Sequence, residues 1–273
     1  MKFKKYILLF ITIISFGYSA HAGWIITQRT YDSDEGIAMA SVETVYLQDN
    51  IMKVTHKDII TIFDLNKELI TLISPAKNVY WTGNITTYKT DMKSGLKQVM
   101  DEQLKAVAPE QREMMKKMFE GMIAAVDDPS KAIENKPKNY SLEIKKTKES
   151  ARIAGYSAVK YQVLVNGALK EEAWLSESSR AHDEFDIYKF YGLFSDFTAQ
   201  SGTMEYYQMH EKYLEFARKG FPLKSVNYYG GYETISEVTK LDKEKIDLSV
   251  FAVPDGYRKA SLMEIGLTTE PNE

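Results

Sequence analysis

The first half of the chain alternates short apolar runs with polar turns. The runs are rich in β-branched and aromatic residues, as in Trp24-Ile-Ile-Thr-Gln-Arg-Thr-Tyr31, and end at turns such as Asp32-Ser-Asp-Glu-Gly36 or Asp49-Asn50. Runs of this length and spacing predict an antiparallel meander of strands. The predicted strands cover residues 24–31, 42–47, 51–56, 58–64, 68–73 and 78–83.

The apolar period then changes to three or four residues over 92–126, which predicts two amphipathic helices laid over one face of a curved sheet. Pro109 begins the second helix, because proline is tolerated in a first turn. Six of the 12 methionines lie in this helical insertion. Flexible, polarizable thioethers can form an adaptable lid over a ligand, or fill gaps in an ordinary core. The ligand-facing candidates are Met100, Leu104, Met114, Met118 and Met122.

The second half of the chain returns to strands. Asn166-Gly167 predicts a tight hairpin within 158–176, because both residues tolerate a positive φ. A terminal hairpin is expected within 221–241, around Gly230-Gly231. The polar residues 259–273 are expected to form a flexible tail.

A second helical block is expected over 184–219, between these two hairpins. Its first helix carries an aromatic stripe at helical spacing, which can either wall a cavity or pack into a core. Three residues of this stripe join the methionines as candidates for binding an apolar ligand, namely Phe190, Phe194 and Phe197.

The start of the chain predicts export. Three lysines precede an apolar run from Tyr6 to Phe16, and the small-residue site Ala20-His-Ala22 follows. This is the pattern of a secretory signal peptide, cleaved before Gly23. The run is too short to span a bilayer, which takes roughly 20 apolar residues. We expect residues 1–22 to be removed, leaving a periplasmic or secreted protein that is not an integral membrane protein.

Cysteine content and charge narrow the range of partners. The chain has no cysteine, which excludes a disulfide framework and a lipid-anchored lipoprotein. It has 35 Lys and Arg against 38 Asp and Glu, a formal charge of −3. The signal peptide holds three lysines and no acidic residue, so the mature charge is −6. A surface of this sign argues against nucleic acid and anionic membrane as standing partners.

No motif in the sequence indicates catalysis. The mature chain keeps only His56, His182 and His210, without a His-x-x-x-His pair. On the inward stripe of its predicted helix, His210 is either a hydrogen-bonded core residue or a ligand or base. Gly-x-Ser-x-Gly, phosphate-loop and dinucleotide motifs do not occur. We therefore predict no enzymatic activity, no metal site and no cofactor.

Four short motifs occur in order within 140–258. They are Ile153-Ala-Gly-Tyr156 with Tyr161, Glu172-Ala-Trp-Leu-Ser176, Gly220-Phe-Pro-Leu-Lys224 and Val253-Pro-Asp-Gly-Tyr257. Together they resemble a family of exported bacterial proteins known as a domain of unknown function and related to the LolA/LolB-like lipoprotein-carrier fold. One difference is Ala158, where related chains often have cysteine. The resemblance implies a single domain over 23–258 of mostly β with α (α+β) class. It also implies a curved, half-open antiparallel β-barrel whose concave face is covered by helices, with an apolar cavity between them.

Three functions agree with these patterns. The first, which we favour, is a non-catalytic periplasmic binder or carrier of an apolar ligand, such as a lipid or a lipoprotein acyl chain. The second is an envelope protein-interaction or sensing module with a filled core and no ligand, docking through a sheet edge. The third is a hydrolase with an unfamiliar site around His210. A cavity between helices and sheet favours the first over the second.

Overall fold

The computed structural model of the protein describes residues 22–56, 58–128, 139–200 and 205–266. The predicted meander forms from Gly23 onward, with each strand antiparallel to the next. One of its turns uses Asp49 and Asn50, whose φ values of 49° and 62° suit these two residue types. The strands are β1 (Gly23–Asp32), β2 (Ser41–Gln48), β3 (Ile51–His56), β4 (Ile59–Asp64), β5 (Leu69–Ser74) and β6 (Val79–Gly83).

The second half of the chain forms another antiparallel meander. Asn166 and Gly167 have φ of 51° and 78° and join two paired strands, which confirms the tight hairpin predicted there. The terminal hairpin around Gly230 and Gly231 is also confirmed. The strands are β7 (Leu142–Ile153), β8 (Tyr156–Val165), β9 (Ala168–Ser176), β10 (Phe221–Tyr229) and β11 (Tyr232–Glu244).

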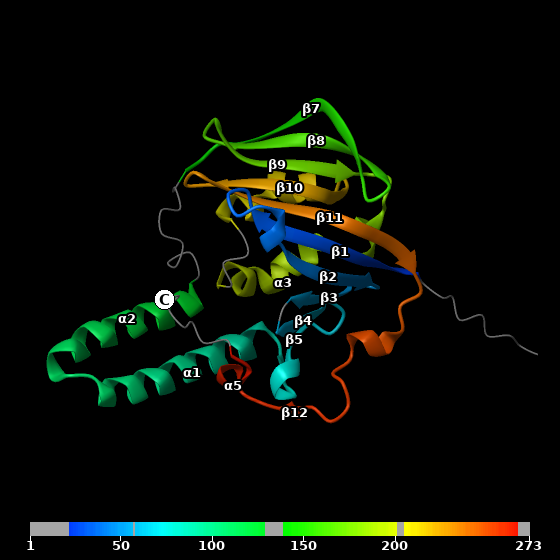
Figure 1. The fold of residues 1–273 in the computed structure, drawn as a ribbon. Coiled ribbons are helices and arrows are strands. Elements are labelled where there is room, and N and C mark those ends of the chain that lie inside the picture. Colours follow the sequence, from blue (N-terminus) through cyan, green and yellow to red (C-terminus); the bar gives the residue numbers. More distant parts are fainter. Residues whose placement is uncertain (1–21, 57, 129–138, 201–204, 267–273) are drawn as a thin grey trace, which may run out of the picture.

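The two meanders join into one open sheet. β1 pairs with β11 along its whole length, and the short strand β12 (Arg258–Lys259) adds to β6 in parallel. The resulting twelve-stranded sheet has the order β12-β6-β5-β4-β3-β2-β1-β11-β10-β9-β8-β7 (Figure 1). Its edges, β12 and β7, do not pair with each other. The predicted α+β fold around a half-open antiparallel sheet is therefore confirmed.

Helices lie on one side of this sheet, in two groups separated along the chain. The first group is a helical hairpin that begins at Ile85, earlier than the predicted start at Met92. Asn84 caps it, because its Oδ1 accepts a hydrogen bond from the Thr87 N–H at 2.9 Å. The helices are α1 (Ile85–Ala106), α2 (Pro109–Asp127), α3 (Ile187–Gln200) and α4 (Glu211–Ala217).

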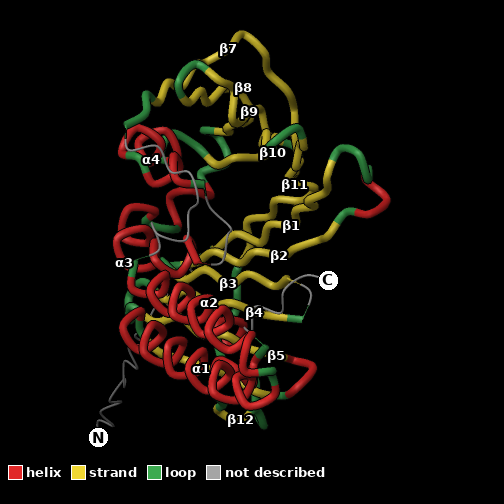
Figure 2. Tube along the Cα trace, turned by 90° about the vertical axis from the view of Figure 1, so that its left-hand side faces the viewer, coloured by secondary structure: helices red, strands yellow, loops and turns green. Residues whose placement is uncertain are grey.

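The outer part of the α1–α2 hairpin extends beyond the sheet (Figure 1), and the two helices run side by side (Figure 2). Near the base, Tyr88 and Leu96 are 4% and 7% exposed, and Lys93 Nζ lies 2.7 Å from Asp127 Oδ1. Toward the outer end, Met114 is 73% exposed. The hairpin thus covers the sheet only near its base, which corrects the expectation that the whole insertion lies over the sheet.

The core has two parts. In the larger one, strands of both meanders pack against α1 and α3, with the Phe63 ring 5.0 Å from Phe190 and 5.4 Å from Phe194. In the smaller one, β7, β8 and β9 pack against α4, where the Tyr161 and Phe216 rings lie 5.1 Å apart. The aromatic stripe of α3 is therefore mainly a core element.

Residues 259–266 are not the flexible tail that their polar composition predicted. Arg258 and Lys259 pair with β6, and the short helix α5 (Leu262–Ile265) follows. Leu262 and Ile265 are only 1% and 2% exposed, so two apolar side chains attach this segment to the core. Residues 267–273 of the predicted tail, and residues 1–21 of the predicted signal peptide, lie outside the described residues.

Candidate functional site

A cavity of about 660 Å³ lies between the sheet and the second helical group. Its floor includes Val45, Leu47 and Met52 from β2 and β3, and its walls come from α3, α4 and the 3-10 helix Ala181–Glu184. Gly220, just before β10, has no room for a side chain, because an added Cβ would lie 2.8 Å from the Ser176 carbonyl oxygen. A volume of this size is within the range of small-molecule sites, roughly 300 to 1,000 Å³.

The aromatic candidates separate into lining and core residues. Phe190 lines the cavity and is 6% exposed. Phe194 and Phe197, at 0% and 9% exposure, do not line it and instead pack around Phe63. The stripe that the sequence singled out thus contributes one ring to the cavity and two to the core behind it.

The methionine candidates lie away from this cavity. Met114 and Met118 are 73% and 52% exposed on α2, whereas Met100, Leu104 and Met122 are partly buried in the hairpin. None of the five lines the cavity. The expected position between helices and sheet is thereby corrected for Met114 and Met118, whose side chains are exposed to solvent on α2. Their predicted ligand-binding role stays a prediction.

Behind the inner wall of the cavity lies a buried acid, Glu171, that the sequence patterns did not single out. Tyr213, from α4, lines the cavity and donates its hydroxyl to Glu171 Oε2 at 2.9 Å and Oε1 at 3.1 Å. Glu171 is 3% exposed, and this burial raises the pKa of its carboxyl although the Tyr213 hydrogen bond opposes the shift. Glu171 lies two and four residues before Ala173 and Leu175, which are buried on the inner face of β9. Because side chains alternate between the two faces of a strand, this spacing would have identified Glu171 as an inward-facing acid.

The tyrosines beside Glu171 stay protonated at neutral pH. Burial raises the pKa of the Tyr191 hydroxyl to about 12, and the nearby Glu171 adds to the shift. Burial also raises the pKa of Tyr213 well above its usual range. The tyrosines of the inner wall are therefore neutral, and the Tyr213 hydroxyl is turned toward Glu171.

The opening of the cavity is polar. The lining residues that reach solvent mark it: Asp183, Asp186 and Arg218 are exposed, and Asn50 and His182 are half-buried. Asn50 Oδ1 accepts a hydrogen bond from the Asp186 N–H at 2.8 Å, which connects the β2–β3 turn to the start of α3. An apolar interior with charged groups at the entrance is the usual composition of a site for an amphipathic molecule.

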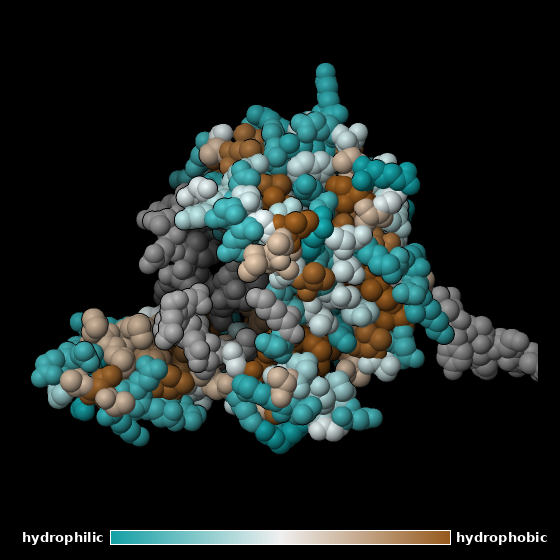
Figure 3. Space-filling view, viewed as in Figure 1, coloured by the Kyte–Doolittle hydropathy of each residue, from teal (hydrophilic) through white to brown (hydrophobic). Residues whose placement is uncertain are grey.

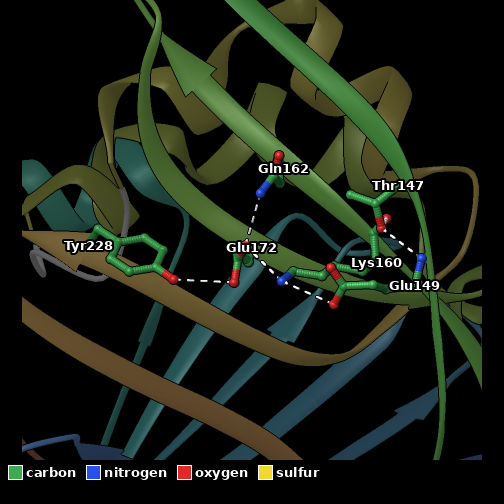
Figure 4. A network of polar contacts seen from close by, with 6 residues as sticks. All are labelled: Thr147, Glu149, Lys160, Gln162, Glu172 and Tyr228. Atoms are coloured by element: carbon green, nitrogen blue, oxygen red, sulfur yellow. Dashed lines mark hydrogen bonds and ion pairs between the residues drawn. The ribbon is translucent and has the colours of Figure 1, made fainter.

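The opposite face of the sheet carries a separate polar network (Figure 4). Lys160 Nζ lies 2.8 Å from Glu172 Oε1, and Tyr228 donates its hydroxyl to Glu172 Oε2 at 3.2 Å. Burial alone would raise the pKa of Glu172, but the hydrogen bonds from Lys160 and Gln162 outweigh it and lower the pKa. Lys160 and Glu172 lie diagonally across the β8–β9 pair, where Glu172 is opposite Gln162, so we assign this network to sheet stability.

The described residues contain no group of three or more His, Asp or Glu side chains that could hold a metal ion. His210 caps α4, since its Nδ1 accepts a hydrogen bond from the Lys212 N–H at 3.2 Å. His210 thus lies half-buried at the N-terminus of α4, which corrects its predicted position on the inward stripe of a helix, and its cap contact is a structural role. None of the described helices combines the length and apolar composition needed to span a membrane.

Comparison with solved structures finds similarity at low identity. PNGF-II is 11% identical over 89% of this chain and 32% of that chain, with a TM-score of 0.36. MucB in complex with MucA(peri) is 10% identical over 87% of this chain and 56% of that chain, with a TM-score of 0.36. The Pseudomonas aeruginosa MucA/MucB complex is 12% identical over 85% and 56%, with a TM-score of 0.35. The chain thus spans about a third of PNGF-II and about half of MucB.

Comparison of the sequence places the chain in a family. No curated protein matches it. A family model described as a domain of unknown function, DUF4412, matches residues 76–257. The match begins at the end of the first meander and includes the α1–α2 hairpin, so it reaches further toward the N-terminus than the motifs within 140–258. The chain therefore belongs to the DUF4412 family.

Proposed function

We propose that this protein binds a lipid-like ligand in the cavity between the sheet and α3 and α4, and carries it in the periplasm. The cavity of about 660 Å³ is the observation on which this function rests. Its apolar lining would remove an acyl chain from water, which contributes about 0.8 kcal/mol for each CH₂ group buried. The predicted signal peptide supports the periplasmic location.

The neutral inner wall of the cavity supports binding over chemistry. Behind this wall, the buried Glu171 is engaged by Tyr213, and His210 serves as a helix cap. At the inner wall a ligand would meet apolar side chains and tyrosines that keep their protons at neutral pH. This composition favours reversible uptake and release of an unmodified ligand.

The proposal is tested by filling the cavity. Ala217 lines it from α4, and Ala217→Trp would occupy part of its volume. We expect the variant to take up a fluorescent fatty acid at least tenfold more weakly than the wild type. Ala124→Trp is the matched control, because Ala124 is exposed on α2 and should leave uptake unchanged. Equal uptake by all three proteins, or none by the wild type, would refute the proposal.

A second function is favoured by the exposed side chains of α2. Met114 and Met118 are 73% and 52% exposed on the projecting hairpin, where Figure 3 shows apolar residues at the surface. Such a surface can contact an envelope protein. The double variant Met114→Lys, Met118→Lys should then lose a partner captured by cross-linking in the native envelope while its fatty-acid uptake is unchanged. Retention of every cross-linked partner would argue against this second function.

A further inference from the structure

The charged side chains at the opening of the cavity differ in how many partners each has within the protein. Two carboxylates and one guanidinium line the opening, from Asp183, Asp186 and Arg218, together with the His182 imidazole. Which of these groups is free to bind a ligand depends on the partners that each already has in the protein.

Both carboxylates have partners close in the chain. Asp183 forms an ion pair with the Arg180 guanidinium, and its Oδ1 lies 3.4 Å from His182 Nε2. Asp186 Oδ1 accepts hydrogen bonds from the N–H groups of Tyr188 and Lys189, at 3.1 and 3.0 Å, and so caps α3. The negative charge at the opening is thereby offset by local cations and by the helix N-terminus.

The guanidinium of Arg218 has no carboxylate partner among the residues that the structure describes. It lies over the face of the Tyr188 ring, whose centre is 5.0 Å from the guanidinium carbon. This stacking leaves the edge of the guanidinium, with its N–H donors, free for another acceptor. Arg218 is also exposed to solvent, so a ligand group at the opening can reach it.

The opposite, inner side of the cavity offers no comparable cation among the described residues that line it. There the polar groups are the Tyr191 and Tyr213 hydroxyls, and the Tyr213 hydroxyl already donates to Glu171. An anion placed against this wall would lie near a buried carboxyl with no cation to balance it. The opening thus has a cation for an anionic head group and the inner side has none among its described lining residues, so an amphiphile would bind with its head group at the opening.

We propose that the ligand is a single-chain amphiphile with an anionic head group, bound with its chain in the cavity and its head group at Arg218. This rests on the proposed function and names the chemical class of its ligand. A carboxylate or a phosphate matches the planar fork of a guanidinium and would form charge-assisted hydrogen bonds to it. Arg218 would then discriminate between head groups, whereas the lining from β2, β3 and α3 would discriminate between chains.

The test compares ligands that share one chain. Laurate, dodecyl phosphate and dodecanol are titrated against the full mature protein loaded with the neutral apolar dye N-phenylnaphthylamine, and dye displacement gives each affinity. We expect the wild type to bind at least one of the two anions about fivefold more tightly than dodecanol, the scale of one charge-assisted hydrogen bond. Comparison of laurate with dodecyl phosphate identifies the preferred anion.

Two variants test whether Arg218 is the source of the preference for anions. Arg218→Gln should bind the anions no better than dodecanol, with dodecanol affinity unchanged. Lys219→Gln is the matched control, because it removes one exposed positive charge from the next position without altering the cavity lining. Equal binding of anions and alcohol by the wild type, or the same loss in both variants, would overturn the head-group assignment while the proposed function stands. Failure of all three ligands to displace the dye would overturn both.

Discussion

The helices α2 and α3 carry similar apolar stripes in different surroundings. On α2, Met114 and Met118 are 73% and 52% exposed, whereas on α3, Phe194 is fully buried at 0%. α3 packs on the sheet next to α4 and contributes Phe190 to the cavity wall, while α2 rests mainly on α1. An apolar stripe thus shows which face of a helix can be buried. Whether that face is buried, and against which element, depends on the tertiary structure.

The largest expected effect is on the α3 side. Phe194→Ala removes a fully buried ring that packs against Phe63 and Phe190. We expect the free energy of unfolding to fall by about 3 to 5 kcal/mol, the usual cost of a buried Phe→Ala change. Urea unfolding followed by tryptophan fluorescence measures it. A loss below about 1 kcal/mol would mean that α3 is not part of the cooperative core.

A smaller effect is expected inside the hairpin. Phe119 is 4% exposed on α2, but the hairpin rests on the body only near its base. Phe119→Ala should destabilise the hairpin locally by about 2 kcal/mol, since a partly solvated neighbourhood can relax around the cavity left behind. Hydrogen exchange should then become faster in α1 and α2 while β1 and β11 keep their protection. Equal acceleration throughout the protein would show that the hairpin and the sheet unfold together.

The sequence predicted the sheet more accurately than the positions of the helices. Asn166-Gly167 and Asp49-Asn50 specify turns through their backbone conformation alone, so they are predictable from local sequence. The exposed position of Met114 could not be predicted in this way, because no local sequence pattern indicates where a helix extends beyond the sheet. The number of charges on each helix did carry information: α3 has only Lys189 and Asp196, while α2 alternates its methionines with many charged residues.

The candidate site was predictable in type, but of the residues that line it only Phe190 was among the candidates. The resemblance implied an apolar cavity between sheet and helices, and a cavity lies there. Its lining comes from β2, β3, α4 and β10, elements far apart in the chain that only the sheet order brings together. Leu262 and Ile265 were overlooked for a different reason: two apolar residues in a polar segment are too few to form a periodic pattern.

A third prediction concerns the pH dependence of stability on the α4 side. Folding raises the pKa of Glu171 above its ordinary value of 4.5, so the folded state holds a proton that the unfolded state releases. The stability of the wild type should therefore decrease as the pH rises from about 4.5 through the folded pKa, with a slope that approaches about 1.4 kcal/mol per pH unit between the two pKa values. Glu171→Gln should remove this decrease, so that the variant gains stability over the wild type with rising pH. Melting temperatures from pH 4 to 8 would show it.

Glu172→Gln, at the neighbouring position, is the control variant and should change the pH dependence of stability in the opposite direction. The hydrogen bonds from Lys160 and Gln162 leave the pKa of Glu172 lowered, so its contribution to stability is present above the ordinary pKa and is lost as the pH falls through the folded pKa. This variant should therefore lose stability relative to the wild type at neutral pH and approach it in acid. The same pH trend in both variants would contradict the assignment of the two neighbouring carboxyls to opposite environments.

The smallest effect is expected at the outer end of α2. Met118 is 52% exposed, so Met118→Ala removes little buried surface and replaces methionine with a slightly better helix former. The free energy of unfolding should change by less than about 0.5 kcal/mol, and fatty-acid uptake should stay as in the wild type. Met100→Ala, at a partly buried position on α1, is the comparison variant and should cost more stability. If Met118→Ala instead weakened uptake severalfold at unchanged stability, the hairpin would have to close over the ligand in solution. The methionines would then regain the lid role that the sequence suggested for them.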